Sequence, residues 1–108
     1  MPSNVLSTVK EALSQLAEDL KKNLGPVEIF LFGSFAKGDW LEDSDIDIIV
    51  VSEAFKGKTM AERVNMVRKL APENLAFEIL TYTPQELKEA LVRSIAIQDA
   101  STYWKKIA

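Results

Sequence analysis

The sequence of 108 residues contains no cysteine and no histidine. These two absences exclude a disulfide framework, a thiolate nucleophile, a zinc site of cysteine and histidine, and an imidazole general base. Any catalysis by this chain therefore has to use carboxylates, hydroxyls, lysine or arginine side chains, backbone amides or a hard metal ion.

A basic excess and long apolar runs are also missing. The 16 acidic residues outnumber the 13 basic ones, whereas proteins that bind long nucleic acids usually carry a net positive charge. We therefore expect no stable nucleic-acid partner. No apolar run reaches the length of a signal peptide or a membrane span, so we expect a soluble, cytoplasmic protein without a membrane partner.

The apolar residues that are present predict a small α/β (α+β) fold. They make up 47% of the chain, enough for one core, and we expect residues 1–108 to form a single domain. Helical spacing and β-branched runs alternate along the chain, which predicts a small mixed sheet of three to four strands backed by helices. The predicted helices cover about residues 4–23, 59–70 and 84 to the C-terminal region, and the predicted strands cover residues 27–32, 45–51 and 75–82.

The C-terminal region begins with Thr83-Pro84-Gln85-Glu86, a hydroxyl N-cap followed by proline and then by glutamate. We place Tyr103 and Trp104 on the last helix, as core or interface packing rather than a base-stacking platform. We interpret Lys105 and Lys106 as solvated residues at a helix end. The apolar stripe of this region fits either the core or a dimer contact, so a homo-oligomer remains open.

One group of residues predicts chemistry. Gly33-Ser34 ends a buried strand, ten residues intervene, and Asp45 and Asp47 open the next strand. Alternation places Asp45 and Asp47 on one face, and Glu78 of a neighbouring strand adds a third carboxylate. Their repulsion, on the order of 3 kcal/mol per close pair, is relieved if a cation lies among them. Oxygen ligands without histidine or cysteine favour Mg²⁺ or Mn²⁺.

The glycine-serine corner supplies what an anionic ligand needs. Gly33 lets a ligand approach the backbone, and the Ser34 hydroxyl and the amides that follow can hold a phosphate. Lys37 adds a nearby positive charge. Together with the carboxylates, this corner predicts a nucleoside triphosphate site for metal-assisted phosphoryl or nucleotidyl transfer.

Each of these residues also has a purely structural interpretation. Gly33-Ser34 can be an ordinary turn at a strand end, and Asp43 a loop residue or a cap. Glu78 can pair with a lysine or arginine, or face solvent on an edge strand. Asp47 is harder to explain in this way. It lies inside a strand that is otherwise predicted to be buried, and the charge of a buried carboxylate has to be compensated.

The segments Leu31–Gly38 and Asp43–Val50 resemble the signature of the nucleotidyltransferase superfamily that includes DNA polymerase beta. The short chain is similar to its minimal nucleotidyltransferases, the MNT proteins of bacteria and archaea. The resemblance extends to Glu78–Pro84, where the family carries a third carboxylate just before a Tyr-Thr-Pro helix start.

The resemblance implies a role for each site residue. Gly33 and Ser34 would bind the triphosphate, Asp45 and Asp47 would hold Mg²⁺, and Glu78 would bridge the metal and act as base. The implied reaction is attack of a hydroxyl on the α-phosphate of an NTP, with release of pyrophosphate, and the group that we expect to be transferred is AMP.

Two positions depart from the family pattern. Glu78 stands where relatives usually carry aspartate, and its extra methylene shifts the carboxylate in a geometry-sensitive step. Phe35 stands where many relatives carry arginine, which leaves Lys37 as the nearby cation.

The resemblance also implies a partner. MNT proteins act as antitoxins of HEPN-domain toxins, and some transfer AMP to a toxin tyrosine. The short chain leaves no room for an acceptor-binding second domain, so we expect a separate folded acceptor, a HEPN-domain protein. The alternative is a non-catalytic antitoxin, a binding module that neutralises such a partner by contact.

Overall fold

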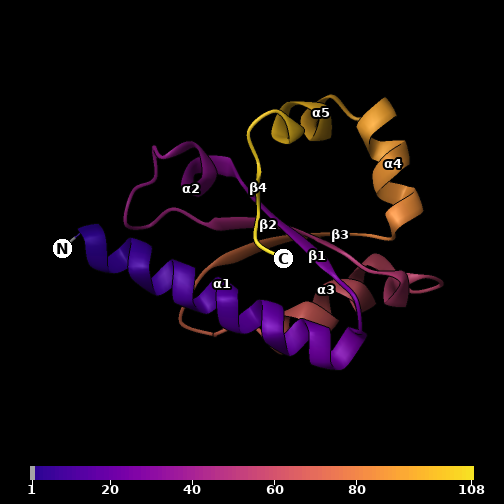
Figure 1. Cartoon of the computed structure of the whole chain (residues 1–108), viewed down its shortest axis with the longest axis horizontal. Helices are drawn as coiled ribbons and strands as arrows, with labels where there is room; N and C mark the ends of the chain where they lie inside the picture. Colours follow the sequence, from indigo (N-terminus) through magenta and orange to yellow (C-terminus); the bar gives the residue numbers. More distant parts are fainter. Residues whose placement is uncertain (1) are drawn as a thin grey trace.

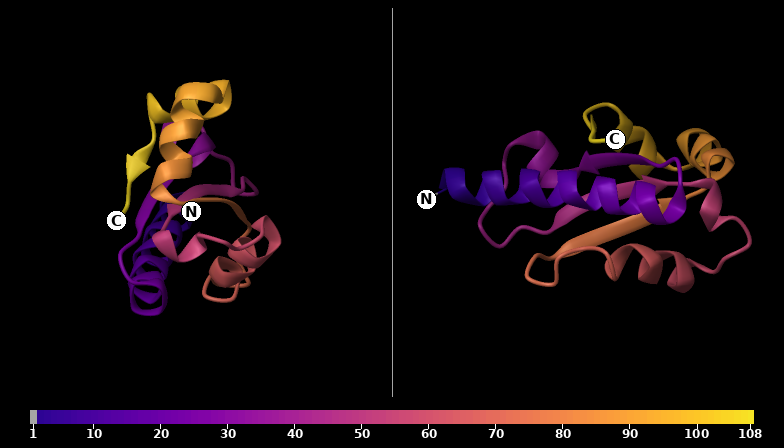
Figure 2. Two further views of the ribbon diagram at one scale, coloured as in Figure 1. Left: turned by 90° about the vertical axis from the view of Figure 1, so that its right-hand side faces the viewer. Right: turned by 60° about the horizontal axis from the view of Figure 1, so that its bottom comes forward.

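The computed structural model describes residues 2–108, and within them a four-stranded mixed sheet carries helices on both faces (Figures 1 and 2). In chain order the elements are α1 (Pro2–Leu24), β1 (Glu28–Phe32), α2 (Gly33–Lys37), β2 (Ile46–Val51), the 3-10 turn η1 (Glu53–Phe55), α3 (Met60–Arg68), β3 (Phe77–Tyr82), α4 (Pro84–Arg93), α5 (Ile95–Ser101) and β4 (Lys105–Lys106). The predicted fold class is confirmed.

The strands lie in the order β3-β2-β1-β4. β2 pairs with β1 in antiparallel and with β3 in parallel orientation, and β4 pairs antiparallel with β1. The parallel pair needs a crossover, which contains α3. β2 is therefore covered on both edges, and its residues from Ile48 to Val51 are all buried, which explains the uninterrupted apolar run in the sequence.

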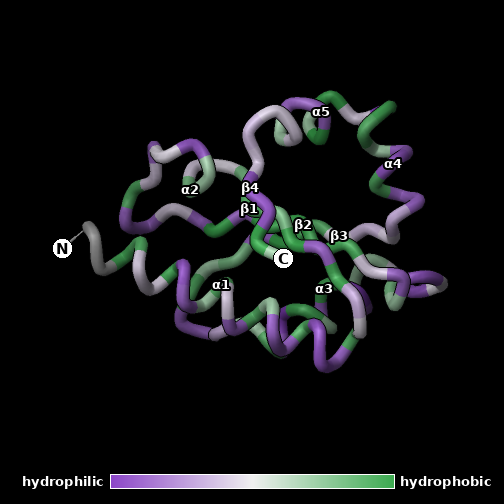
Figure 3. Tube along the Cα trace, in the orientation of Figure 1, coloured by the Kyte–Doolittle hydropathy of each residue, from purple (hydrophilic) through white to green (hydrophobic). Residues whose placement is uncertain are grey.

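Two apolar layers hold the sheet between the helices. Helices α1 and α3 lie below the sheet in Figure 1, and α4 and α5 lie above it. The lower layer packs Leu16 and Leu20 of α1 against Ile48 of β2, and the upper layer packs Leu87 of α4 and Ile97 of α5 near Ile49. Figure 3 shows the hydrophobic residues concentrated along the central strands. In the described part of the chain, no helix is both long and apolar enough to cross a membrane.

The start of α4 follows the predicted capping pattern. The Thr83 hydroxyl accepts a hydrogen bond from the Glu86 amide at 3.2 Å, and Glu86 Oε1 accepts one from the Thr83 amide at 2.8 Å. Pro84 occupies the first turn, where no donor is lost. This prediction is confirmed in detail.

The prediction for the end of the chain is wrong. Helix α5 ends at Ser101, so Tyr103 and Trp104 lie outside it, and Lys105–Lys106 form β4 instead of a helix end. The Trp104 ring stacks on Phe30 of β1, with 4.3 Å between centroids. This contact brings the chain alongside β1, where backbone pairing replaces helical hydrogen bonds.

Candidate functional site

The corner after β1 lies directly against a carboxylate of β2. Gly33 has a left-handed φ of +69°, and a Cβ at this position would lie 1.9 Å from Asp47 Oδ2. Only glycine combines this backbone conformation with such close approach. The group that lies against Gly33 in this structure is the carboxylate of Asp47. The approach of a ligand to the Gly33 backbone stays a prediction.

The acidic residues come from adjacent positions of two neighbouring strands. Asp47 of β2 pairs in register with Glu78 of β3, so their side chains leave the same face of the sheet. Asp45 lies just before β2, which begins one residue later than predicted because the Ile46 amide opens the ladder with a hydrogen bond to the Ala76 carbonyl. Asp47 is half-buried, whereas Asp45 and Glu78 are exposed.

The surroundings of Asp47 disfavour its negative charge. The pKa of Asp47 is raised from 3.8 to about 6, first by burial, then by the charge of Glu78 and a hydrogen bond with its carboxyl group, and last by the charge of Asp45. Across residues 2–108, the ion pairs join Arg63 to Glu86 and Lys106 to Glu28. In the described part of the chain, Asp45, Asp47 and Glu78 therefore take part in no ion pair with a basic side chain.

A hard divalent cation fits this donor set. The oxygens of Asp47 and Glu78 are the kind of ligand that Mg²⁺ and Mn²⁺ prefer, and a cation would reverse the repulsion that raises the pKa of Asp47. No three acidic side chains of the described residues already converge closely enough to hold a metal ion. Asp45 and Glu78 are exposed and free of ion pairs in the described chain, so they can turn towards a cation.

Two further predicted residues lie on α2. The Ser34 carbonyl accepts hydrogen bonds from the amides of Gly38 and Asp39, which closes the turn, and the residue is half-buried. Lys37 is exposed, and its ammonium lies 4.7 Å from the ring centroid of Tyr103, in a cation–π contact. Lys37 thus contacts an aromatic ring of the C-terminal segment.

Tyr103 is a residue of this corner that the sequence did not reveal. Its hydroxyl accepts a hydrogen bond of 3.2 Å from the Gly33 amide, although 70 positions separate the two residues. The predicted core packing of Tyr103 is confirmed, because its ring packs against the apolar layer on the α1 side. Its hydroxyl, in addition, reaches the loop after β1. No motif around Tyr103 signals this contact, because it depends on β4 lying along β1.

Phe35 belongs to the core rather than to the site. Its side chain is 5% exposed, stacks on Trp40 with 5.3 Å between centroids, and joins the apolar layer on the α1 side of the sheet. Asp47 and Glu78 face the opposite layer. The departure at Phe35 is therefore explained by packing.

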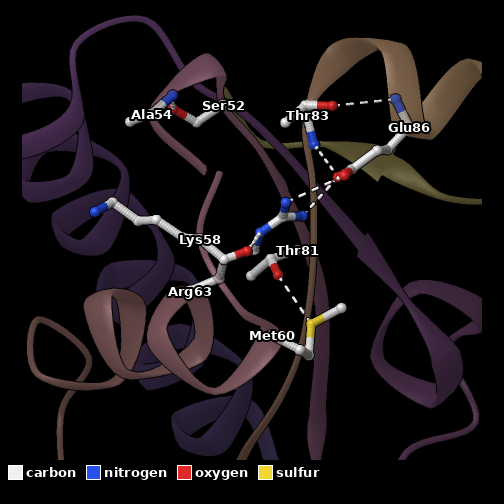
Figure 4. A network of polar contacts seen from close by, with 8 residues as sticks. All are labelled: Ser52, Ala54, Lys58, Met60, Arg63, Thr81, Thr83 and Glu86. Carbon is white, nitrogen blue, oxygen red and sulfur yellow. Dashed lines mark hydrogen bonds and ion pairs between the residues drawn. The ribbon is translucent and has the colours of Figure 1, made fainter. Parts of the chain in front are cut away.

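A second polar cluster lies at the other end of β3 (Figure 4). Arg63 of α3 is buried and donates two hydrogen bonds to the Glu86 carboxylate, at 2.5 and 3.1 Å, and a third to the Lys58 carbonyl at 3.0 Å. The bonds from Arg63, and then the one from the Thr83 amide, lower the pKa of Glu86 to about 2. This pair joins the two helical layers across the edge of the sheet and accounts for the buried arginine.

A family model described as a nucleotidyltransferase domain matches residues 13–102. The chain belongs to this family. The match spans both the corner after β1 and all three carboxylates, and it confirms the family that the sequence resembles.

Curated relatives agree with this nucleotidyltransferase assignment. Two proteins of Methanocaldococcus jannaschii, each named "putative protein adenylyltransferase", are similar to the chain. One is 28% identical over 76 residues, which are 70% of this chain and 73% of the relative. The other is 35% identical over 65 residues, which are 60% of this chain and 65% of the relative. Together with the family match, they identify a nucleotidyltransferase of the MNT type.

Solved structures share the fold. A structure described as a "putative nucleotidyltransferase" from Sulfolobus solfataricus matches with a TM-score of 0.67 at 24% identity, over 80% of this chain and 77% of that one. A structure described as a "toxin-antitoxin with AMP-PNP" matches with a TM-score of 0.63 at 23% identity, over 88% of this chain and 72% of that one.

Proposed function

We propose that this nucleotidyltransferase domain is a Mg²⁺-dependent protein adenylyltransferase that transfers AMP from ATP to a hydroxyl group of a partner protein. The observation that carries the proposal is the contact of Gly33 with Asp47, beside Glu78. It joins a backbone corner suited to phosphate to the carboxylates suited to a cation. The names of the archaeal relatives support a protein acceptor, and the nucleotide analogue in the toxin-antitoxin structure supports an adenine nucleotide.

Each residue of the site has a role in this proposal. Gly33 and Ser34 hold the triphosphate, and Lys37 supplies positive charge beside it. Asp45 and Asp47 hold Mg²⁺, which when bound would neutralise charge on the phosphate oxygens. Glu78 completes this carboxylate set and takes the proton of the acceptor hydroxyl.

The reaction breaks and forms one phosphorus–oxygen bond. The acceptor oxygen attacks the α-phosphorus of ATP, the bond from that phosphorus to the bridging oxygen breaks, and pyrophosphate leaves. The products are an AMP ester of the acceptor and pyrophosphate. The carboxylate of Glu78 is exposed on β3, so an acceptor on another protein can reach it.

The acceptor that we propose is a HEPN-domain toxin, to which this chain acts as antitoxin. A non-catalytic antitoxin that neutralises the toxin by contact is the second candidate. It is favoured by Glu78, whose side chain is exposed and carries one methylene more than the aspartate usual at this position. The two candidates differ in whether a phosphorus–oxygen bond is made.

Isothermal titration with ATP, with and without Mg²⁺, tests the site itself. We expect the wild-type protein to bind ATP and Mg²⁺ to strengthen binding, and Asp47→Ala to abolish the effect of Mg²⁺. Asp19→Ala is the matched control, because Asp19 lies on α1 and its carboxylate accepts a hydrogen bond from the side chain of Gln15, away from the site. No ATP binding under either condition would rule out the enzymatic function.

A transfer assay separates the two candidates. ATP labelled at the α-phosphate is incubated with the chain and its co-purified partner, and the partner is examined for the label. Asp45→Ala should lose the transfer, and ATP labelled at the γ-phosphate should leave the partner unlabelled. An Asp45→Ala protein that still neutralises its partner fully, with no label on the partner from the wild type, favours the binding module.

A further inference from the structure

Tyr103 is held firmly at the corner of the proposed nucleotide site. Its hydroxyl accepts the hydrogen bond of the Gly33 amide at 3.2 Å, and its ring contacts the ammonium of Lys37. The next residue, Trp104, stacks on Phe30, and β4 then pairs with β1. Tyr103 is thus fixed by neighbours on its C-terminal side, and its contact with Gly33 is a built part of the fold.

Both groups that Tyr103 contacts are groups that the proposed function assigns to the triphosphate. The Gly33 amide carries a single hydrogen, which is already donated to the Tyr103 hydroxyl. The positive charge of Lys37 lies over the ring instead of over the site. A phosphate oxygen can therefore bind the Gly33 amide only where the hydroxyl gives way.

We propose that Tyr103 is an internal occupant of the phosphate subsite: its hydroxyl takes the place of a phosphate oxygen on Gly33, and nucleotide binding replaces it. This inference rests on the proposed function and adds selectivity to it. A phosphate oxygen is charged and forms a stronger hydrogen bond with an amide than a neutral phenol does. ATP can therefore displace the hydroxyl, whereas a nucleoside without phosphates gains nothing there.

The Tyr103 hydroxyl also stabilises the free protein. When no ligand is bound, it accepts the hydrogen bond of the half-buried Gly33 amide, which would otherwise lack an acceptor at a cost in free energy. Removing the hydroxyl leaves this amide without that acceptor in the free protein, and a phosphate oxygen then supplies it. Both effects act in the same direction and strengthen nucleotide binding when the hydroxyl is lost.

The test compares Tyr103→Phe with Tyr82→Phe, the only other tyrosine of the chain. Each variant removes one hydroxyl and keeps the ring, so Lys37 keeps its aromatic contact at position 103. Tyr82 lies at the far end of β3, beyond the carboxylates, and is a matched control. Titration with ATP and Mg²⁺ should show Tyr103→Phe binding roughly 2- to 10-fold more tightly than the wild type, the value of one neutral hydrogen bond. Tyr82→Phe should bind as the wild type does.

The outcomes separate this inference from the proposed function. If neither the wild type nor Tyr103→Phe binds ATP, the proposed function is wrong and the inference falls with it. If the wild type binds ATP and Tyr103→Phe binds equally or more weakly, the inference alone is wrong, since the hydroxyl then does not compete with phosphate.

A second measurement needs no nucleotide. The chain has four glycines, so their amide signals are readily assigned in a nitrogen-15 NMR spectrum. Tyr103→Phe should shift the Gly33 signal of the free protein and leave that of Gly57 in place. A Gly33 signal that does not respond would overturn the contact on which the inference rests.

Discussion

Replacing Gly33 by alanine tests the contact between the corner after β1 and the carboxylates. The new methyl group would lie 1.9 Å from Oδ2 and 2.8 Å from Cγ of Asp47. Atoms cannot remain at these distances, so either the carboxylate or the backbone has to move. We expect the variant to lose stability and ATP binding together.

The size of the effect follows from two contributions. Alanine at a left-handed φ costs about 1–2 kcal/mol, and displacing a packed side chain costs about 1–3 kcal/mol more. Gly57 has a similar φ of +78°, but nothing lies within 4 Å of its hypothetical Cβ. Gly57→Ala therefore carries the first contribution alone, and Gly33→Ala should lose about 2–5 kcal/mol in total.

Urea unfolding measures both variants, and a double variant identifies the cause. With Asp47→Ala as background, the nearest remaining atom of residue 47 is its Cβ at 3.1 Å. The excess cost of Gly33→Ala over Gly57→Ala should then fall below about 1 kcal/mol. The contact would be refuted if Gly33→Ala and Gly57→Ala lowered the free energy of unfolding equally. It would also be refuted if the larger loss of Gly33→Ala persisted in the Asp47→Ala background.

Three further variants probe charge and packing. Asp47→Asn should lose Mg²⁺-dependent ATP binding and yet raise the free energy of unfolding of chelator-treated protein. The folded-state pKa of Asp47 is about 6, above its ordinary 3.8. Full conversion of this shift would give about 3 kcal/mol. Because Asp47 is partly exposed and solvent screens its charge, we expect a gain on the order of 1–2 kcal/mol at pH 8, which shrinks as the pH falls from 6 to 4. Glu86→Gln should destabilise the protein by about 1–2 kcal/mol at pH 7, a modest value because the Glu86 side chain is 40% exposed. The pKa of Glu86 is lowered to about 2. The difference in free energy of unfolding between wild type and Glu86→Gln, measured with urea, should therefore become smaller as the pH falls from about 5 towards 2. Phe35→Arg, which introduces the residue common in relatives, should lower the free energy of unfolding by about 3 kcal/mol or more, because it buries a charge against Trp40. A stable variant that binds ATP more tightly would show instead that position 35 faces the site.

The elements that the sequence predicts well are those defined by local chemistry. Thr83, Pro84 and Glu86 specify a helix start within four residues, and the structure contains the expected hydrogen bonds. The alternation of side chains along β2, which places Ile46 and Ile48 on the face opposite to that of Asp47, likewise needs only the geometry of one strand. Such features depend on contacts between residues close in the chain.

The features that escaped prediction depend on distant contacts. β4 has two residues, too few for any periodicity, and it exists because Trp104 packs on Phe30. The contact of Tyr103 with Gly33 follows from that placement. The buried Arg63 is equally invisible in the sequence, because its acceptor is 23 positions away on another helix.

The sheet order has a consequence for how the site assembles and opens. Gly33 and Asp47 belong to the antiparallel pair β1–β2, whose contacts are short in sequence, whereas Glu78 arrives only through the crossover that contains α3. Contacts of short separation tend to form first in folding, so we expect the carboxylate of Glu78 to join last. As an edge strand, β3 also has a pairing neighbour on one side only, and edge elements open at lower free energy than central ones. Fraying of this one strand would therefore stop the chemistry while the remaining sheet stays folded, and amide exchange along β3 should slow when ATP binds.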